Sequence, residues 1–151
     1  MAVGGAPTAA EFRRNLLREL DFKREERNLQ QFARNFEGDG TVRFPRPYPG
    51  LSTRRVLTME RLDGIPVSYT GRIDVVGANM EELAKRGANL YLEMIFRDGF
   101  YHADPHPGNI LVLPGGAIGL LDCGMVGRLD VQTRDNFEGL VQALVEKDAG
   151  K

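Results

Sequence analysis

The stretch that most constrains what this chain can fold into is Tyr101–Asn109. It holds two histidines, an aspartate, two prolines, a glycine and an asparagine between apolar segments. Pro105 and Pro107 each lack a backbone N–H and clash with a preceding helical turn, so the stretch cannot be the interior of a helix. The same two prolines exclude a central β-strand. We therefore expect a rigid, polar loop.

The residues after this loop predict a β-hairpin. Two short apolar runs, 110–113 and 117–121, flank a Pro-Gly-Gly turn at 114–116, and this combination is typical of two strands joined by a tight turn. A turn at these positions places Ile110 opposite Leu120 across the hairpin.

The hairpin brings polar side chains together at its open end. Asn109 falls opposite Leu121, so Asn109 and Asp122 are expected side by side, with Asp104 on the loop that leads in. Three oxygen-bearing side chains then meet where the strands end. Oxygen ligands of this kind suit a divalent cation such as magnesium.

Composition excludes several classes of protein. The 151 residues are compatible with one domain, and a net charge of −1 gives no support for a nucleic-acid partner. Cys123 is the single cysteine, which excludes an internal disulfide and fits a reducing compartment. No apolar stretch approaches a membrane span, and residues 1–10 lack the pattern of a signal peptide. We therefore expect a cytoplasmic protein.

Hydrophobic periodicity predicts an α+β fold. Helical spacing covers about 9–36, 80–97 and 132–146, and strand-like runs occur at 41–44 and 54–60. Two strands do not make a stable sheet alone. These two need partners, and nothing before the first helix supplies them.

Glu25 lies in the apolar stripe of the first helix. A carboxylate that faces a core is costly unless it is paired. Two interpretations stay open: Glu25 sits at the edge of the stripe or pairs with a local arginine, or it meets a cation from outside the helix.

The basic side chains of the same helix are interpreted as a solvated face rather than a binding patch, because many acids interleave with them. They are Arg13, Arg14, Arg18, Lys23, Arg24, Arg27 and Arg34.

The polar loop has the spacing that phosphoryl transfer uses. His102-x-Asp104 is followed after four residues by Asn109, and Asp122-x-Gly ends the hairpin. In such sites one aspartate orients or deprotonates the acceptor hydroxyl, while the asparagine and the second aspartate hold metal. The alternative is a structural turn in which Asp104 and Asn109 cap backbone groups.

A zinc hydrolase is another alternative, because His102 and His106 are four residues apart. Zinc takes three or four protein ligands. These are the chain's only histidines, and Pro105 denies them a shared helix face.

Four segments together resemble the UbiB/AarF/ADCK (ABC-one) atypical kinase family. Phe100–Asn109 resembles its signature, and Glu19–Asn28 is similar to its E-L-D-[YF]-x-x-E-A-x-N helix. Leu57–Gly64 resembles its hinge strand, and Leu120–Gly127 resembles its metal-binding segment. The resemblance covers roughly residues 11–147.

The resemblance implies a protein-kinase-like bilobal fold that is incomplete here. We expect a disordered N-terminus at 1–10, a partial N-lobe at 11–62 and a partial C-lobe with the catalytic loop at 63–151. The family's strand with the ATP-binding lysine would precede residue 11, so the chain is expected to be a fragment.

The same resemblance assigns roles to residues. Asp104 would be the catalytic aspartate, and Asn109 and Asp122 would be magnesium ligands. Glu19 or Glu25 would pair with the nucleotide-binding lysine, and the spacing does not decide between them.

The hinge, whose backbone meets adenine, would be formed by Glu60, Arg61 and Leu62. The resemblance implies ATP and Mg²⁺ as cofactors, kinase or ATPase activity, and a role in ubiquinone or isoprenoid-lipid metabolism. It adds an isoprenoid lipid or a membrane surface as a partner, with a cytoplasmic location peripheral to a membrane. A non-catalytic kinase-like module that binds lipid or protein is the alternative. One departure is Cys123, which replaces the usual Phe of the kinase Asp-Phe-Gly motif and would fill its site less fully.

Overall fold

The computed structural model describes residues 21–69, 79–136 and 139, and it confirms an α+β fold. The N-terminal segment 1–20, with the start of the first predicted helix and Glu19, lies outside the described residues, as does most of the predicted helix 132–146. The main elements are α2 (Phe22–Asn35), β1 (Val42–Arg43), β2 (Ile65–Pro66), α3 (Met80–Leu92), β3 (Phe100–His102), β4 (Ile110–Val112), β5 (Ile118–Leu120) and β6 (Val126–Arg128).

Helix α2 begins at a capped residue and buries the predicted stripe. The Asp21 carboxylate accepts a hydrogen bond from the Lys23 N–H at 3.1 Å, which satisfies one free donor of the first turn. Leu29 and Phe32 have no exposed surface. The Phe32 ring stacks on Phe44, with ring centroids 5.0 Å apart, so α2 is fixed against the core.

Four strands form one sheet in the order β1-β5-β4-β2. The hairpin β4–β5 has the predicted register, with Ile110 opposite Leu120. Its turn needs glycine, because Gly115 and Gly116 have φ angles of 79° and 77°. Strand β1 joins β5 in parallel, and β2 joins β4 antiparallel. The hairpin therefore lies at the centre of the sheet.

The predicted strand at 41–44 finds the partner it needs in the hairpin, because β1 pairs with β5. The predicted strand at 54–60 was wrong: within the described residues, it has one isolated bridge, between Met59 and Pro47. Two backbone hydrogen bonds flank this bridge, from Tyr48 N–H to Thr58 O and from Glu60 N–H to Arg46 O, and the facing segment then turns away in a 3₁₀ turn at Pro49–Leu51. Strand β2 follows at Ile65–Pro66, where no strand was predicted.

The expected loop at 101–109 begins later than predicted. Tyr101 and His102 belong to β3, which pairs antiparallel with β6 so that His102 lies opposite Val126. The prolines that exclude a strand start at Pro105, and they leave the preceding residues free to extend.

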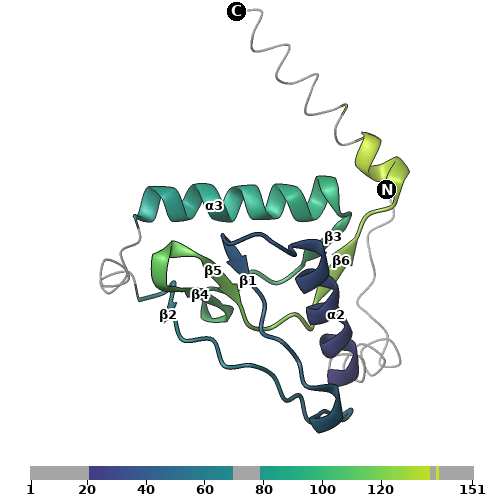
Figure 1. The fold of residues 1–151 in the computed structure, drawn as a ribbon. Coiled ribbons are helices and arrows are strands. Elements are labelled where there is room, and N and C mark those ends of the chain that lie inside the picture. Colours follow the sequence, from purple (N-terminus) through teal and green to yellow (C-terminus); the bar gives the residue numbers. More distant parts are fainter. Residues whose placement is uncertain (1–20, 70–78, 137–138, 140–151) are drawn as a thin grey trace, which may run out of the picture.

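Helix α3 crosses one side of the four-stranded sheet, and α2 stands beside the β3–β6 pair (Figure 1). Side chains from both helices and from β5 share one core, which includes Leu29, Leu90 and Leu120. The opposite side of the hairpin packs Leu111 on Leu62. A wider π-helical turn, Glu93–Arg97, continues α3 toward β3. None of the described helices is long and apolar enough to cross a bilayer.

Candidate active site

A pocket of about 220 Å³ opens between the start of α2, the loop after β3 and the turn after β5. It brings together three of the predicted site residues, Glu25, Asp104 and Asp122. Its lining is Phe22, Glu25, His102, Asp104, Asp122, Gly124 and Met125.

Asp122 is held by its own turn. Its Oδ1 accepts a 2.9 Å hydrogen bond from the Gly124 N–H. A Cβ on Gly124 would lie 3.2 Å from Asp122 Oδ1 and 3.8 Å from Glu25 Oε2. The glycine therefore leaves room for both carboxylates beside the turn. The side chain of Asp122 remains exposed and able to take a ligand.

Glu25 faces inward, and its hydrogen-bonding partner is a backbone group. Its Oε1 accepts a 3.3 Å hydrogen bond from the Cys123 N–H. Burial raises the pKa of the Glu25 carboxyl, and the negative charge of Asp122 raises it further. No lysine or arginine in the described ranges forms an ion pair with Glu25. The two neighbouring carboxylates thus form an acidic site without a protein counter-charge.

His102 connects the two aspartates. Its Nδ1 accepts a 3.2 Å hydrogen bond from the Asp104 N–H, and its Nε2–H donates to the backbone carbonyl of Asp122. Only 3% of the surface of His102 is exposed, so the ring is buried between these two hydrogen bonds. Both ring nitrogens are engaged, which leaves no lone pair for zinc. The sequence motif contained His102, but it did not reveal this bridging role.

Asn109 ends a single 3₁₀ turn, Pro107–Asn109. Its carbonyl accepts a 2.9 Å hydrogen bond from the Leu121 N–H, so the predicted pairing at the open end of the hairpin is confirmed for the backbone. Its side chain is not among those that line the pocket of Asp104. The structure therefore joins Asp104 with Asp122 and leaves Asn109 at the margin.

The expected hinge residues line a different pocket, of about 720 Å³, which shares no residue with the first. The Glu60 carboxylate pairs with Arg43 and accepts from the Arg46 N–H. Burial opposes a lower pKa of Glu60, but these two partners outweigh it and lower the pKa. Arg61 is exposed and pairs with Asp63, and Leu62 is buried under the hairpin.

Asn28 is a functional candidate for which sequence reasoning gave no role. It is buried, and its Nδ2 donates a 2.8 Å hydrogen bond to the Cys123 carbonyl. Helix α2 thus binds both backbone groups of Cys123, one through Asn28 and one through Glu25. The available signal was the i, i+3 spacing of these two polar residues on an otherwise apolar stripe.

The carboxylates of this pocket suit a cation that takes most of its ligands from water and phosphate rather than from the protein. Among residues 21–69, 79–136 and 139, no group of three or more His, Cys, Asp or Glu side chains is arranged to hold a metal by itself. Magnesium uses one or two carboxylates and completes its shell with water and phosphate oxygens. The adjacent Glu25 and Asp122 carboxylates fit that smaller requirement.

Known proteins have sequences similar to this chain. Residues 6–151 match the ABC1 atypical kinase-like domain. A probable protein kinase UbiB from Vibrio atlanticus is 39% identical over 93% of this chain and 27% of its own length. A UbiB from Vibrio campbellii is 42% identical over 82% of this chain and 24% of its own. The chain therefore spans about a quarter of the length of these relatives.

A solved structure agrees. Rv3197 from Mycobacterium tuberculosis, determined with erythromycin, is 27% identical with a TM-score of 0.57, over 82% of this chain and 32% of that one. The fold is thus the kinase-like α+β arrangement that the sequence motifs implied. Because the domain match covers nearly every residue, the chain belongs to the ABC1 atypical kinase-like family.

Proposed function

We propose that this chain carries the catalytic and metal-binding part of an ATP- and magnesium-dependent kinase or ATPase of the UbiB type. The observation that supports it is the meeting of Asp104, Asp122 and Glu25 in one pocket, with His102 linking the two aspartates. The names of the bacterial relatives support the same activity.

Asp104 is the proposed catalytic residue. Its side chain is exposed, and its backbone N–H is fixed by His102. A carboxylate held in this way can orient an acceptor hydroxyl or take its proton. Phosphoryl transfer depends mainly on such positioning and on charge stabilisation.

Asp122 and Asn109 are the proposed magnesium ligands. Bound magnesium would neutralise charge on the phosphates. The Asp122 turn, tied to α2 through Cys123, keeps the carboxylate at the pocket. Glu25 adds a second negative charge there, so a cation would relieve the repulsion that raises its pKa.

The proposed roles in nucleotide binding are based on the family resemblance. Glu19 or Glu25 would pair with an ATP-binding lysine, and the backbone of Glu60, Arg61 and Leu62 would meet adenine. A division into an N-lobe at 11–62 and a C-lobe at 63–151 belongs to the same proposal. So does a role in ubiquinone or isoprenoid-lipid metabolism, at a cytoplasmic membrane surface.

The test is magnesium-dependent ATP turnover in the full-length protein. We expect Asp122→Asn and Asp104→Asn to lower the rate at least a hundredfold, because each removes a charge that the reaction uses. Asp135→Asn is the matched control, since Asp135 is exposed and is not among the residues that line the pocket. Equal rates in wild type and Asp122→Asn would refute the enzymatic proposal.

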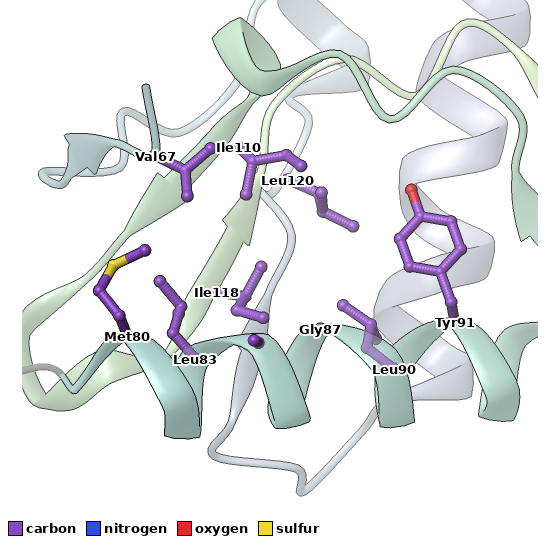
Figure 2. A pocket seen from close by; sticks show the side chains of 10 residues that line it. Val67, Met80, Leu83, Gly87, Leu90, Tyr91, Ile110, Ile118 and Leu120 are labelled. Carbon is purple, nitrogen blue, oxygen red and sulfur yellow. The ribbon is translucent and has the colours of Figure 1, made fainter. Parts of the chain in front are cut away.

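A second candidate function is a non-catalytic module that binds a lipid. It is favoured by a cavity of about 240 Å³ between α3 and the sheet, where apolar side chains point toward one another (Figure 2). Its lining is Val67, Met80, Leu83, Ala84, Gly87, Leu90, Tyr91, Ile110, Ile118 and Leu120.

The two candidates are separable by blocking this cavity. Ala84→Trp places a large side chain at the lining, while Ala88→Trp adds the same bulk on the exposed side of α3. Lipid binding predicts that farnesol, a short isoprenoid alcohol, binds wild type and Ala88→Trp but not Ala84→Trp. Absence of farnesol binding in all three proteins would refute the lipid candidate.

A further inference from the structure

Three arginines of helix α2 line one pocket that contains none of the described acids of the helix. Glu25 accepts a hydrogen bond from the Cys123 N–H, and Glu26 pairs with Lys23 at 2.8 Å. Arg24 and Arg27, with Arg34 two turns after Arg27, line the pocket together. Arg13, Arg14 and Arg18, which belong to the predicted solvated face, lie outside the described residues.

A fourth arginine completes a basic pocket between α2 and β6. The pocket has a volume of about 510 Å³, and no carboxylate lines it. We call it the arginine pocket, and it consists of Arg24, Arg27, Asn28, Gln30, Gln31, Arg34, Val126 and Arg128. It shares no lining residue with the pocket of Asp104.

The arginines of this pocket have no ion-pair partner among the described residues. None of the four has a carboxylate group of that part of the chain within 4.0 Å, whereas Arg43 and Arg86 each have one and Arg97 has two. Like charges gathered in one pocket repel each other, and an anion that enters it removes this repulsion. The pocket therefore selects for negative charge.

Two of the guanidinium groups are already oriented. Arg34 Nη2 donates to Gln31 Oε1 at 2.9 Å. The Arg128 guanidinium lies over the Phe100 ring, 4.6 Å from its centroid. A guanidinium that is held before binding loses less conformational freedom when a ligand arrives. These contacts distinguish the pocket from a surface with freely moving side chains.

We propose that the arginine pocket binds a phosphomonoester. Its charge of about −1.5 to −2 and its three acceptor oxygens match a pocket lined by several guanidinium groups, because guanidinium groups bind phosphate bidentately. The volume exceeds what inorganic phosphate alone needs, so the phosphate is attached to a further group, either a soluble small molecule or a lipid headgroup. The lining of this site shares no residue with the pocket of Asp104, so the proposal does not depend on the proposed ATP chemistry.

The arginine pocket is also connected to the turn that carries Asp122. Asn28, part of its lining, holds the Cys123 carbonyl, and β6 follows directly after the Asp122 turn. A ligand bound between α2 and β6 would therefore join the two elements that position Asp122. Binding there is expected to stabilise the fold as well as to occupy the pocket.

The test uses the whole chain and defined probes. Calorimetry at pH 7.5 measures binding of inorganic phosphate and phenyl phosphate, and co-sedimentation measures binding to phosphatidylcholine vesicles with and without phosphatidic acid. We expect Arg24→Gln and Arg27→Gln to weaken binding at least tenfold. Arg55→Gln removes an equal charge from an exposed position outside the pocket and should leave binding unchanged. Far-UV circular dichroism verifies that each variant folds.

A change of pH adds a second readout. A phosphomonoester gains its second charge near pH 6, while arginine stays charged throughout. Binding should therefore weaken between pH 7.5 and pH 5.5. Binding of the soluble probes alone identifies a small-molecule ligand, and binding of phosphatidic acid vesicles alone identifies a headgroup. No saturable binding of any probe, or equal loss in Arg55→Gln, would overturn the proposal.

Discussion

The side-chain amide of Asn28 donates a 2.8 Å hydrogen bond to the backbone carbonyl of Cys123, 95 residues later in the chain. Both groups are buried. The bond anchors the Asp122 turn to α2 beside Glu25, so the position of a proposed metal ligand depends on a residue in a distant helix.

Removing this anchor should be costly. Asn28→Ala leaves the buried Cys123 carbonyl without its partner, and we expect a loss of about 1–3 kcal/mol in the free energy of unfolding. Urea denaturation followed by circular dichroism measures it. Asn89→Ala, at an exposed position of α3, is the control and should change stability far less. Equal effects of the two changes would contradict the anchoring role.

Glu25 should make stability depend on pH. Because its pKa is raised in the folded protein, its stabilising effect is complete below the unfolded value of about 4.5 and is lost as pH rises through the folded pKa. Glu25→Gln keeps an acceptor for the Cys123 N–H but cannot ionise. We expect a flatter profile of urea midpoint against pH between 4 and 7. The exposed Glu37→Gln should keep the wild-type slope.

Tyr91 carries a hydroxyl whose removal should be tolerated. Its oxygen is buried and has no hydrogen-bond partner in the described structure. Burial, followed by the charges of Cys123 and Asp104, raises the Tyr91 pKa to about 12. Tyr91→Phe should leave stability unchanged or raise it by about 1 kcal/mol, because an unsatisfied polar group is removed. Thermal unfolding measures this, with the exposed Tyr69→Phe as control. A large loss of stability would reveal a partner for the hydroxyl.

Gly127 should not accept a side chain. A Cβ there would lie 2.1 Å from Tyr101 Cζ, so alanine forces the ring away from β6. We expect Gly127→Ala to cost about 1–3 kcal/mol, as overpacking usually does. Gly40→Ala is the control, since no atom lies within 4 Å of its Cβ. Equal urea midpoints for the two variants would show that the ring moves without cost.

The hairpin was predictable in register because its signals are local: an apolar run, a Pro-Gly-Gly turn and a second apolar run. The segment 54–60 was misjudged because its strand propensity needs a long extended partner, and the neighbouring segment turns away at Pro49–Leu51. Strands β3 and β6 were missed because each is three residues long and depends on a partner more than twenty residues away.

In the candidate site, too, some features could be predicted from local sequence and others could not. Helical spacing placed Glu25 in the apolar stripe but left its direction open, whereas the nearness of Asp104 and Asp122 followed from the hairpin. The partners of Glu25 and Asn28 could not be inferred, since both lie on Cys123, which only the folded chain brings to α2. The role of His102 as a bridge was hidden for the same reason.

The parallel pairing of β1 with β5 has a kinetic consequence. Val42 pairs with Ile118 across about half of the chain, whereas Ile110 and Leu120 meet by closing a short turn. Short loops close faster than long ones. We therefore expect the hairpin to form early and to act as the template on which β1 and β2 assemble at its two edges. A change that weakens the Pro-Gly-Gly turn would slow the folding of the whole sheet.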